Sequence, residues 1–108
     1  MRKLVLIEAL LAISLSLMAG GPAKTYKNPV VNYSLPDPSV IKGDDGYFYL
    51  YATEDIRNLP IHRSKDLVNW ESVGTAFTPE TRPTFEPKGN LWAPDINKIG
   101  NKYVLYYS

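Results

Sequence analysis

The sequence has no cysteine and a single histidine, His62. The lack of cysteine excludes disulfides and thiolate metal sites, so an exported domain with this sequence must be stabilised by its apolar core alone. His62 has no histidine or acidic neighbour at ligand spacing, which argues against a metal site. We therefore expect no metal and no cofactor, and we interpret His62 as a structural or surface residue rather than a catalytic one.

Long apolar runs are also missing, apart from one near the N-terminus. Arg2 and Lys3 precede an apolar run of about nine residues, which is shorter than the roughly 20 that a membrane helix needs. Small residues follow it, and this order is typical of an export signal. Glu8 is unusual in such a segment, and a transmembrane anchor or a buried helix is the alternative. We predict a signal peptide over 1–23, a mature chain over 24–108, and a secreted or periplasmic location without membrane attachment.

An excess of one charge sign is absent as well. The chain has 12 basic and 11 acidic residues and a formal net charge of +1. Removal of residues 1–23 leaves equal numbers of both. Nucleic acid and anionic lipid favour clustered positive charge, so neither is an expected partner. A neutral, tyrosine-rich surface is compatible with an uncharged glycan.

From Lys24 onward no window has the periodicity of a helix, and the sequence predicts an all-β fold. Short apolar or aromatic runs are separated by turn residues. The predicted strands of a first unit are 39–42, 47–53, 61–64 and 70–74. A second unit begins near Leu91 and reaches its second strand at 102–107. In 47–51 and 103–107 apolar or aromatic residues occupy both faces, which is typical of strands buried on both sides.

Two aspartates occupy corresponding positions in the two units. Asp37 stands between two prolines and leads through a strand and a turn into the first aromatic strand, and Asp95 also follows a proline and leads in the same order into the second. If the units stack around an axis, the two carboxylates converge, as they do in enzymes that cleave glycosidic bonds. The proline after Asp37 predicts extended backbone at that residue. A simple turn role for Asp37 is the alternative.

Four-stranded sheets that pack face to face around an axis are the blades of a propeller. The predicted strands account for one whole blade and half of the next. The proline-rich stretch 77–90 then connects the two blades. A linker between two separate domains is the alternative, but the residues after it are too few for a second core.

Three motifs give the sequence a specific family resemblance. They are LPDPSVI at 35–41, SKDLVNW at 64–70, and LWAPDI at 91–96 followed by YVLYYS at 103–108. In this order and spacing they resemble the N-terminal third of glycoside hydrolase family 43, most closely the endo-arabinanases and related arabinosidases. The resemblance covers nearly all of the chain after residue 23.

The resemblance implies a five-bladed β-propeller that cleaves α-L-arabinofuranosidic or β-D-xylosidic bonds of plant cell-wall polysaccharide with inversion. Asp37 would be the general base that activates water. Asp95 would be the second aspartate, which orients the general acid and raises its pKa by the proximity of like charge. Inverting enzymes hold acid and base roughly 6.5–9.5 Å apart so that water fits beneath the sugar. The implied partner is an arabinan or arabinoxylan oligosaccharide.

Two tryptophans have different expected roles. Trp92 lies shortly before Asp95 and could offer an apolar face to a sugar ring as a substrate-binding residue, and a tryptophan in the blade core is the alternative. In the turn at 64–70, Asp66 is expected to bond the backbone of its own turn while Trp70 packs between blades. We interpret this second motif as a device that stabilises the fold.

The general acid is the part that the resemblance does not supply. In the family it is a glutamate from a later blade. The glutamates after residue 23 stand in no such motif; they are Glu54, Glu71, Glu80 and Glu86. The 108-residue chain alone is therefore expected to be inactive, and its uncovered blade faces predict poor stability. The alternative function is a non-catalytic glycan-binding propeller or an inactive remnant.

Overall fold

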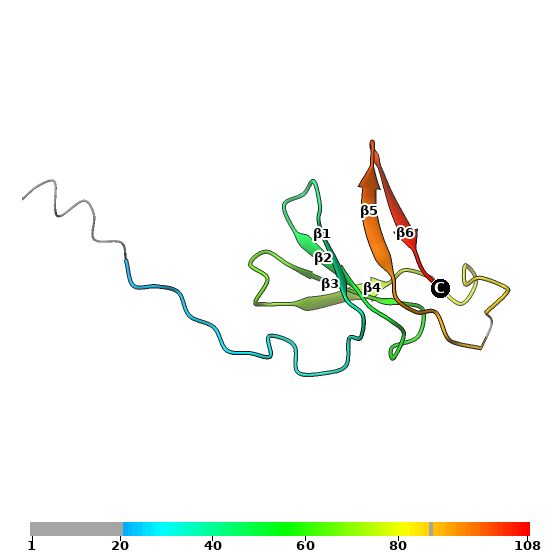
Figure 1. Ribbon diagram of the computed structural model, residues 1–108, viewed down its shortest axis with the longest axis horizontal. Coiled ribbons are helices and arrows are strands. Elements are labelled where there is room, and N and C mark those ends of the chain that lie inside the picture. Colours follow the sequence, from blue (N-terminus) through cyan, green and yellow to red (C-terminus); the bar gives the residue numbers. More distant parts are fainter. Residues whose placement is uncertain (1–20, 87) are drawn as a thin grey trace, which may run out of the picture.

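The computed structural model describes residues 21–86 and 88–108, so almost all of the predicted signal peptide over 1–23 lies outside the described residues. Within these ranges the protein is all-β, with two antiparallel sheets and no helix. Figure 1 shows the two sheets beside each other and an extended N-terminal segment, coloured blue to cyan, that leads into them. No helix that could cross a membrane is present among the residues that the structure describes.

The first sheet is a four-stranded meander in the order β1 (Ser39–Lys42), β2 (Phe48–Tyr51), β3 (Pro60–Ser64) and β4 (Glu71–Thr75). The turn between β1 and β2 depends on glycine. Gly46 adopts φ +83° there, and its N–H donates to the Gly43 carbonyl at 3.1 Å. A Cβ on Gly43 would lie 2.7 Å from Asp45 Oδ1, so a larger residue would force the Asp45 side chain to shift.

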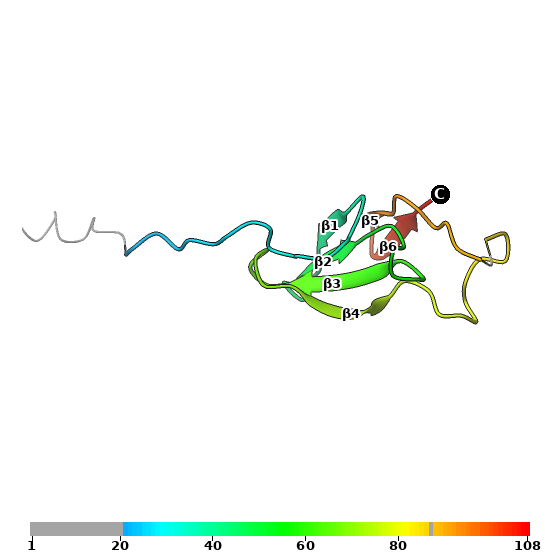
Figure 2. The same ribbon diagram turned by 90° about the horizontal axis from the view of Figure 1, so that it is seen from below.

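The second sheet is a hairpin of β5 (Asp95–Ile99) and β6 (Lys102–Tyr106). Gly100, at φ +61°, lies in its turn. β5 contacts β1, and Figures 1 and 2 both place the hairpin next to the β1–β2 side of the first sheet. The division into four strands and two strands is the one that the sequence predicts.

The core lies where the two sheets and their connections meet. Its buried apolar side chains are Leu50, Ala52, Leu59, Leu91 and Ile96. Phe77, from the connection after β4, packs edge-on against Tyr107 with the ring centroids 5.3 Å apart. The connecting segment is therefore part of the packed structure that joins the two sheets.

Strand boundaries agree with the predicted ones to within a few residues. The predicted strand 47–53 ends at Tyr51, because the chain leaves the sheet there for a loop that is buried at both ends and exposed at its middle, 55–57. β3 begins at Pro60, one residue earlier than predicted, at the first position of a strand, where proline is tolerated.

The prediction that both aromatic strands are buried on both faces is wrong for β6. Tyr103 and Tyr106, whose side chains point to opposite faces of the hairpin, are 46% and 55% exposed. In β2 only Leu50 is buried, and the aromatic residues around it are half-buried. β4 is exposed along its whole length. Each sheet therefore presents an uncovered surface.

Candidate active site

Asp37 and Asp95 lie at the starts of two neighbouring strands. Asp37 comes just before β1, and Asp95 is the first residue of β5. The two strands run in the same direction, since Ser39 contacts Asp95 at one end and Asp44 forms an ion pair with Lys98 at the other. The structure therefore brings both aspartates to one end of the sheet pair. Both residues are exposed, so a ligand can reach them.

The carboxylate of Asp37 is held by a hydroxyl from the loop after β2. Thr53 Oγ1 donates to Asp37 Oδ2 at 2.7 Å. Thr53 Oγ1 also accepts the backbone N–H of Ala93 at 2.7 Å, and the Thr53 N–H donates to the Pro36 carbonyl at 2.9 Å. Thr53 thus contacts both the Asp37 turn and the segment that leads into Asp95.

The carboxylate of Asp95 has a hydroxyl partner from the other unit. Ser39 Oγ donates to Asp95 Oδ1 at 3.3 Å and accepts the Ile96 N–H at 3.1 Å. The sequence analysis missed both Ser39 and Thr53. Ser39 lies inside the Asp37 motif and could have been noticed there, whereas Thr53 stands in no motif.

The prediction that Asp37 is extended is wrong. Asp37 has φ +48°, in the left-handed region, and Ala93, which also precedes a proline, has φ +44°. A following proline disfavours the right-handed helical region, but tertiary contacts decide which other region is used. Here the hydrogen bonds of Thr53 to Pro36 and Asp37 hold the turn in this conformation. Such backbone strain persists only where the surroundings enforce it.

Trp92 is a surface residue in this structure. Its side chain is 55% exposed, so the described residues leave much of its ring uncovered. Its backbone exchanges two hydrogen bonds with Ser108, at 2.7 and 3.0 Å, which continue the pairing of β5 and β6. The ring is therefore presented from a fixed backbone shortly before Asp95.

Comparison with known proteins identifies the family. The family model described as "Glycosyl hydrolases family 43" matches residues 26–108. The chain belongs to glycosyl hydrolases family 43. Together with the motifs around Asp37 and Asp95, this match confirms the resemblance inferred from the sequence.

Individual members of family 43 are similar to the chain over most of its length. A non-reducing end α-L-arabinofuranosidase of Bacteroides ovatus is 37% identical over 76% of the chain and 17% of its own length. A xylan 1,3-β-xylosidase of a Vibrio species is 40% identical over 78% of the chain and 16% of its own length. The solved structure of Cellvibrio cellulosa α-L-arabinanase has a TM-score of 0.61 and 33% identity, and the match covers 70% of the chain and 24% of that structure. The chain thus spans less than a third of the length of these relatives.

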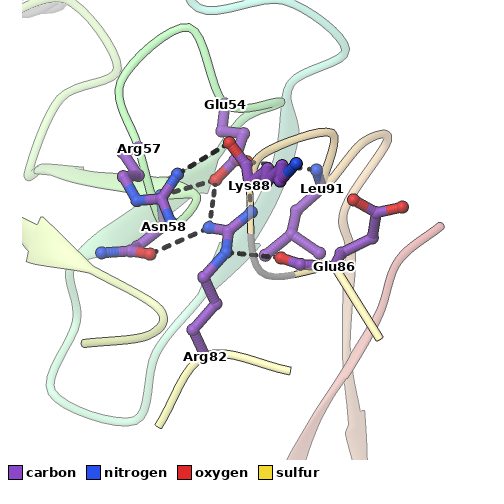
Figure 3. A network of polar contacts seen from close by, with 7 residues as sticks. All are labelled: Glu54, Arg57, Asn58, Arg82, Glu86, Lys88 and Leu91. Atoms are coloured by element: carbon purple, nitrogen blue, oxygen red, sulfur yellow. Dashed lines mark hydrogen bonds and ion pairs between the residues drawn. The ribbon is translucent and has the colours of Figure 1, made fainter. Parts of the chain in front are cut away.

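Glu54 cannot serve as the general acid of the site, because it forms a buried ion pair with Arg82. Both Glu54 and Arg82 have side chains only 3% exposed, and they form an ion pair at 2.6 Å, shown in Figure 3. The Arg82 guanidinium, with help from the N–H groups of Asn58 and Leu91, outweighs burial and lowers the pKa of Glu54 to about 2. Glu54 is therefore ionised near neutral pH and has no proton to donate.

The remaining described glutamates lie in β4 and in the connection after it. Glu71 is in β4, where it pairs with Arg63 at 2.6 Å on the surface. Glu80 and Glu86 are in the connection after β4. Glu54 directly follows Thr53, which contacts Asp37 and Ala93, but among the described residues no glutamate is hydrogen-bonded to Asp37 or Asp95. No group of three or more potential metal-ligating side chains occurs in 21–86 or 88–108.

His62 is buried in β3, where it contacts Tyr33. It is 1% exposed, and its Nε2 lies 2.6 Å from the Tyr33 hydroxyl. Burial lowers the pKa of His62 and favours the neutral ring. The interpretation of His62 as a structural residue agrees with this position in β3.

The turn after β3 forms as predicted around Asp66. Its Oδ1 accepts the N–H groups of Val68 and Asn69 at 2.9 and 2.8 Å, and these bonds hold the pKa of Asp66 well below its usual range. Trp70 donates its indole N–H to the Leu67 carbonyl at 3.1 Å. Instead of packing between the sheets, Trp70 lines a cavity of about 690 Å³ together with the N-terminal segment.

Proposed function

We propose that residues 24–108 are the N-terminal part of a secreted, inverting glycoside hydrolase with a five-bladed propeller, exported by a signal peptide over 1–23. Its substrates would be α-L-arabinofuranosidic or β-D-xylosidic bonds in arabinan or arabinoxylan. Membership of family 43 and the names of the arabinanase, arabinofuranosidase and xylosidase relatives support this proposal. The observation that carries it is the pair of exposed aspartates at one end of the β1–β5 pair.

Asp37 is the general base in this proposal. Its exposed carboxylate can accept a proton from water, because Thr53 bonds one of its oxygens at 2.7 Å and none of the described residues donates to the other. Asp95 orients the general acid and keeps it protonated through like charge. Trp92 offers its exposed ring to a sugar. The general acid in this proposal is a glutamate outside the described residues, as the family resemblance implies, because Glu54 is ionised and held by Arg82.

The test is Asp37→Asn in the full-length protein, with arabino- and xylo-oligosaccharides as substrates. General base catalysis contributes about 10²–10⁴-fold, so turnover is expected to fall by that factor while calorimetric binding of the sugar survives. Asp44→Asn is the matched control, because Asp44 is an exposed carboxylate at the opposite end of β1. Near-normal turnover of Asp37→Asn would remove Asp37 from the mechanism. Proton NMR of the first-formed anomer would test inversion.

A non-catalytic glycan-binding propeller is the second candidate. It is favoured by the lack of a protonatable glutamate beside the two aspartates within the described residues. In this case Asp37 and Asp95 hydrogen-bond sugar hydroxyls without chemistry. Calorimetric binding of the oligosaccharides with no product after prolonged incubation would favour this candidate over the hydrolase.

A further inference from the structure

Thr53 connects the two segments that carry the aspartates through a single hydroxyl. A threonine hydroxyl has one proton to donate and two lone pairs to accept with. The Ala93 N–H can only donate, and it occupies one lone pair at 2.7 Å. An ionised carboxylate can only accept, so the hydroxyl proton goes to Asp37 Oδ2, also at 2.7 Å. The chain of hydrogen bonds therefore has one direction, from Ala93 through Thr53 to Asp37.

Both segments that Thr53 contacts are strained. Asp37 at φ +48° and Ala93 at φ +44° lie in a region that residues other than glycine rarely adopt. Each precedes a proline, so neither can relax into the right-handed helical region without a clash. The Thr53 hydroxyl bonds both residues, so it restrains the backbone of two segments as well as the Asp37 side chain.

Ser39 forms a second connection of the same kind. Its hydroxyl accepts the Ile96 N–H at 3.1 Å and donates to Asp95 Oδ1 at 3.3 Å. In both cases a hydroxyl of the first unit accepts a hydrogen bond from a backbone N–H of the second unit and donates one to an aspartate carboxylate. The longer donor distance makes the Ser39 connection the weaker one.

We propose that Thr53 is the positioning residue of this site, which fixes the Asp37 carboxylate and ties it to the backbone before Asp95. The proposal rests on the role of Asp37 in the proposed function. Without the Thr53 hydroxyl, Asp37 keeps its carboxylate but loses the bond that sets its rotation. The Ala93 segment loses its acceptor at the same time, so the weaker Ser39 connection is left to hold the separation of the two aspartates.

The test compares Thr53→Val with Thr53→Ser in the full-length protein. Valine keeps the branched shape of threonine and lacks the hydroxyl, whereas serine keeps the hydroxyl. Thr53→Val is expected to lower kcat by about 10- to 100-fold, the usual cost of a misplaced catalytic group, with little change in KM. Thr53→Ser is expected to stay within about threefold of the wild type, because its hydroxyl restores the orientation of Asp37.

Amide hydrogen exchange at Ala93 gives a readout that does not depend on activity. The Ala93 amide is expected to be protected in the wild type and in Thr53→Ser, and to exchange faster in Thr53→Val. Exchange of wild-type Ala93 at the rate of an unprotected amide would overturn the proposal, even if Thr53→Val did not fold. Equal turnover of the two Thr53 variants would also overturn it. If Asp37→Asn retained full turnover, the role of Asp37 as general base would fail, and the Ala93 result would still test the Thr53 connection.

Discussion

Glu54→Gln in the full-length protein is expected to destabilise the fold strongly, although glutamine has nearly the same shape. Glu54 receives four hydrogen bonds in a site where its side chain is 3% exposed. The donors are Arg82 Nη1 and Nη2 at 2.8 and 2.6 Å and the N–H groups of Asn58 and Leu91 at 2.7 and 3.3 Å. Glutamine turns one acceptor into a donor that faces other donors, and it removes the negative charge that Glu54 places beside the buried Arg82 guanidinium.

The size of the effect follows from burial. Removing one partner of a buried ion pair costs about 3–5 kcal/mol, because the charge that remains is left uncompensated. Arg82 keeps two neutral acceptors, the Asn58 Oδ1 at 2.9 Å and the Glu86 carbonyl at 2.7 Å, which places the expected loss near the lower end, about 3 kcal/mol. Since whole domains are stable by about 5–15 kcal/mol, this is a large fraction of the total.

Urea unfolding measures this loss as a shift of the midpoint at constant slope. Glu71→Gln is the matched control, because the Arg63–Glu71 pair has a similar distance of 2.6 Å but side chains that are 36% and 59% exposed. Exposed pairs contribute at most about 1 kcal/mol, so the control is expected to change the midpoint little. If Glu54→Gln and Glu71→Gln shifted the midpoint equally, the argument that burial sets the effect would be refuted.

Three further predictions concern stability and activity. The folded pKa of Glu54, about 2, is below its ordinary value, so its stabilising contribution is present above about pH 4.5 and lost as the pH falls toward 2; acid unfolding of Glu54→Gln should lack this component. Asp66→Ala should lower the melting temperature more than Lys65→Ala, since Asp66 Oδ1 bonds two backbone N–H groups of its turn. Residues 24–108 produced alone should show no hydrolysis and no sharp cooperative melt by calorimetry, because β4 and the tyrosines of β6 are exposed.

The sequence predicted those parts of the fold that depend on neighbours along the chain. The strands follow apolar and aromatic runs, and the turns follow glycine, asparagine and aspartate, as in the Asp66 turn after β3. The buried pair of Glu54 and Arg82 was not predicted, because 28 positions separate the two residues and no local pattern links them. The exposure of β6 was also missed, since an aromatic strand has the same sequence whether or not a sheet covers its outer face.

In the candidate site, too, the sequence predicted what depends on neighbouring residues and missed the contacts between residues far apart in the chain. Asp37, Asp95 and Trp92 were found because they stand in motifs, and the structure places the two aspartates at one end of β1 and β5. The hydroxyls that hold the aspartates act across 16, 40 and 56 positions, so their role exists only in the folded chain. The same distant bonds explain why the local proline rule failed at Asp37, where Thr53 selects a left-handed backbone. A motif can therefore single out candidate groups for chemistry, but their orientation is decided by residues such as Thr53 that stand in no motif.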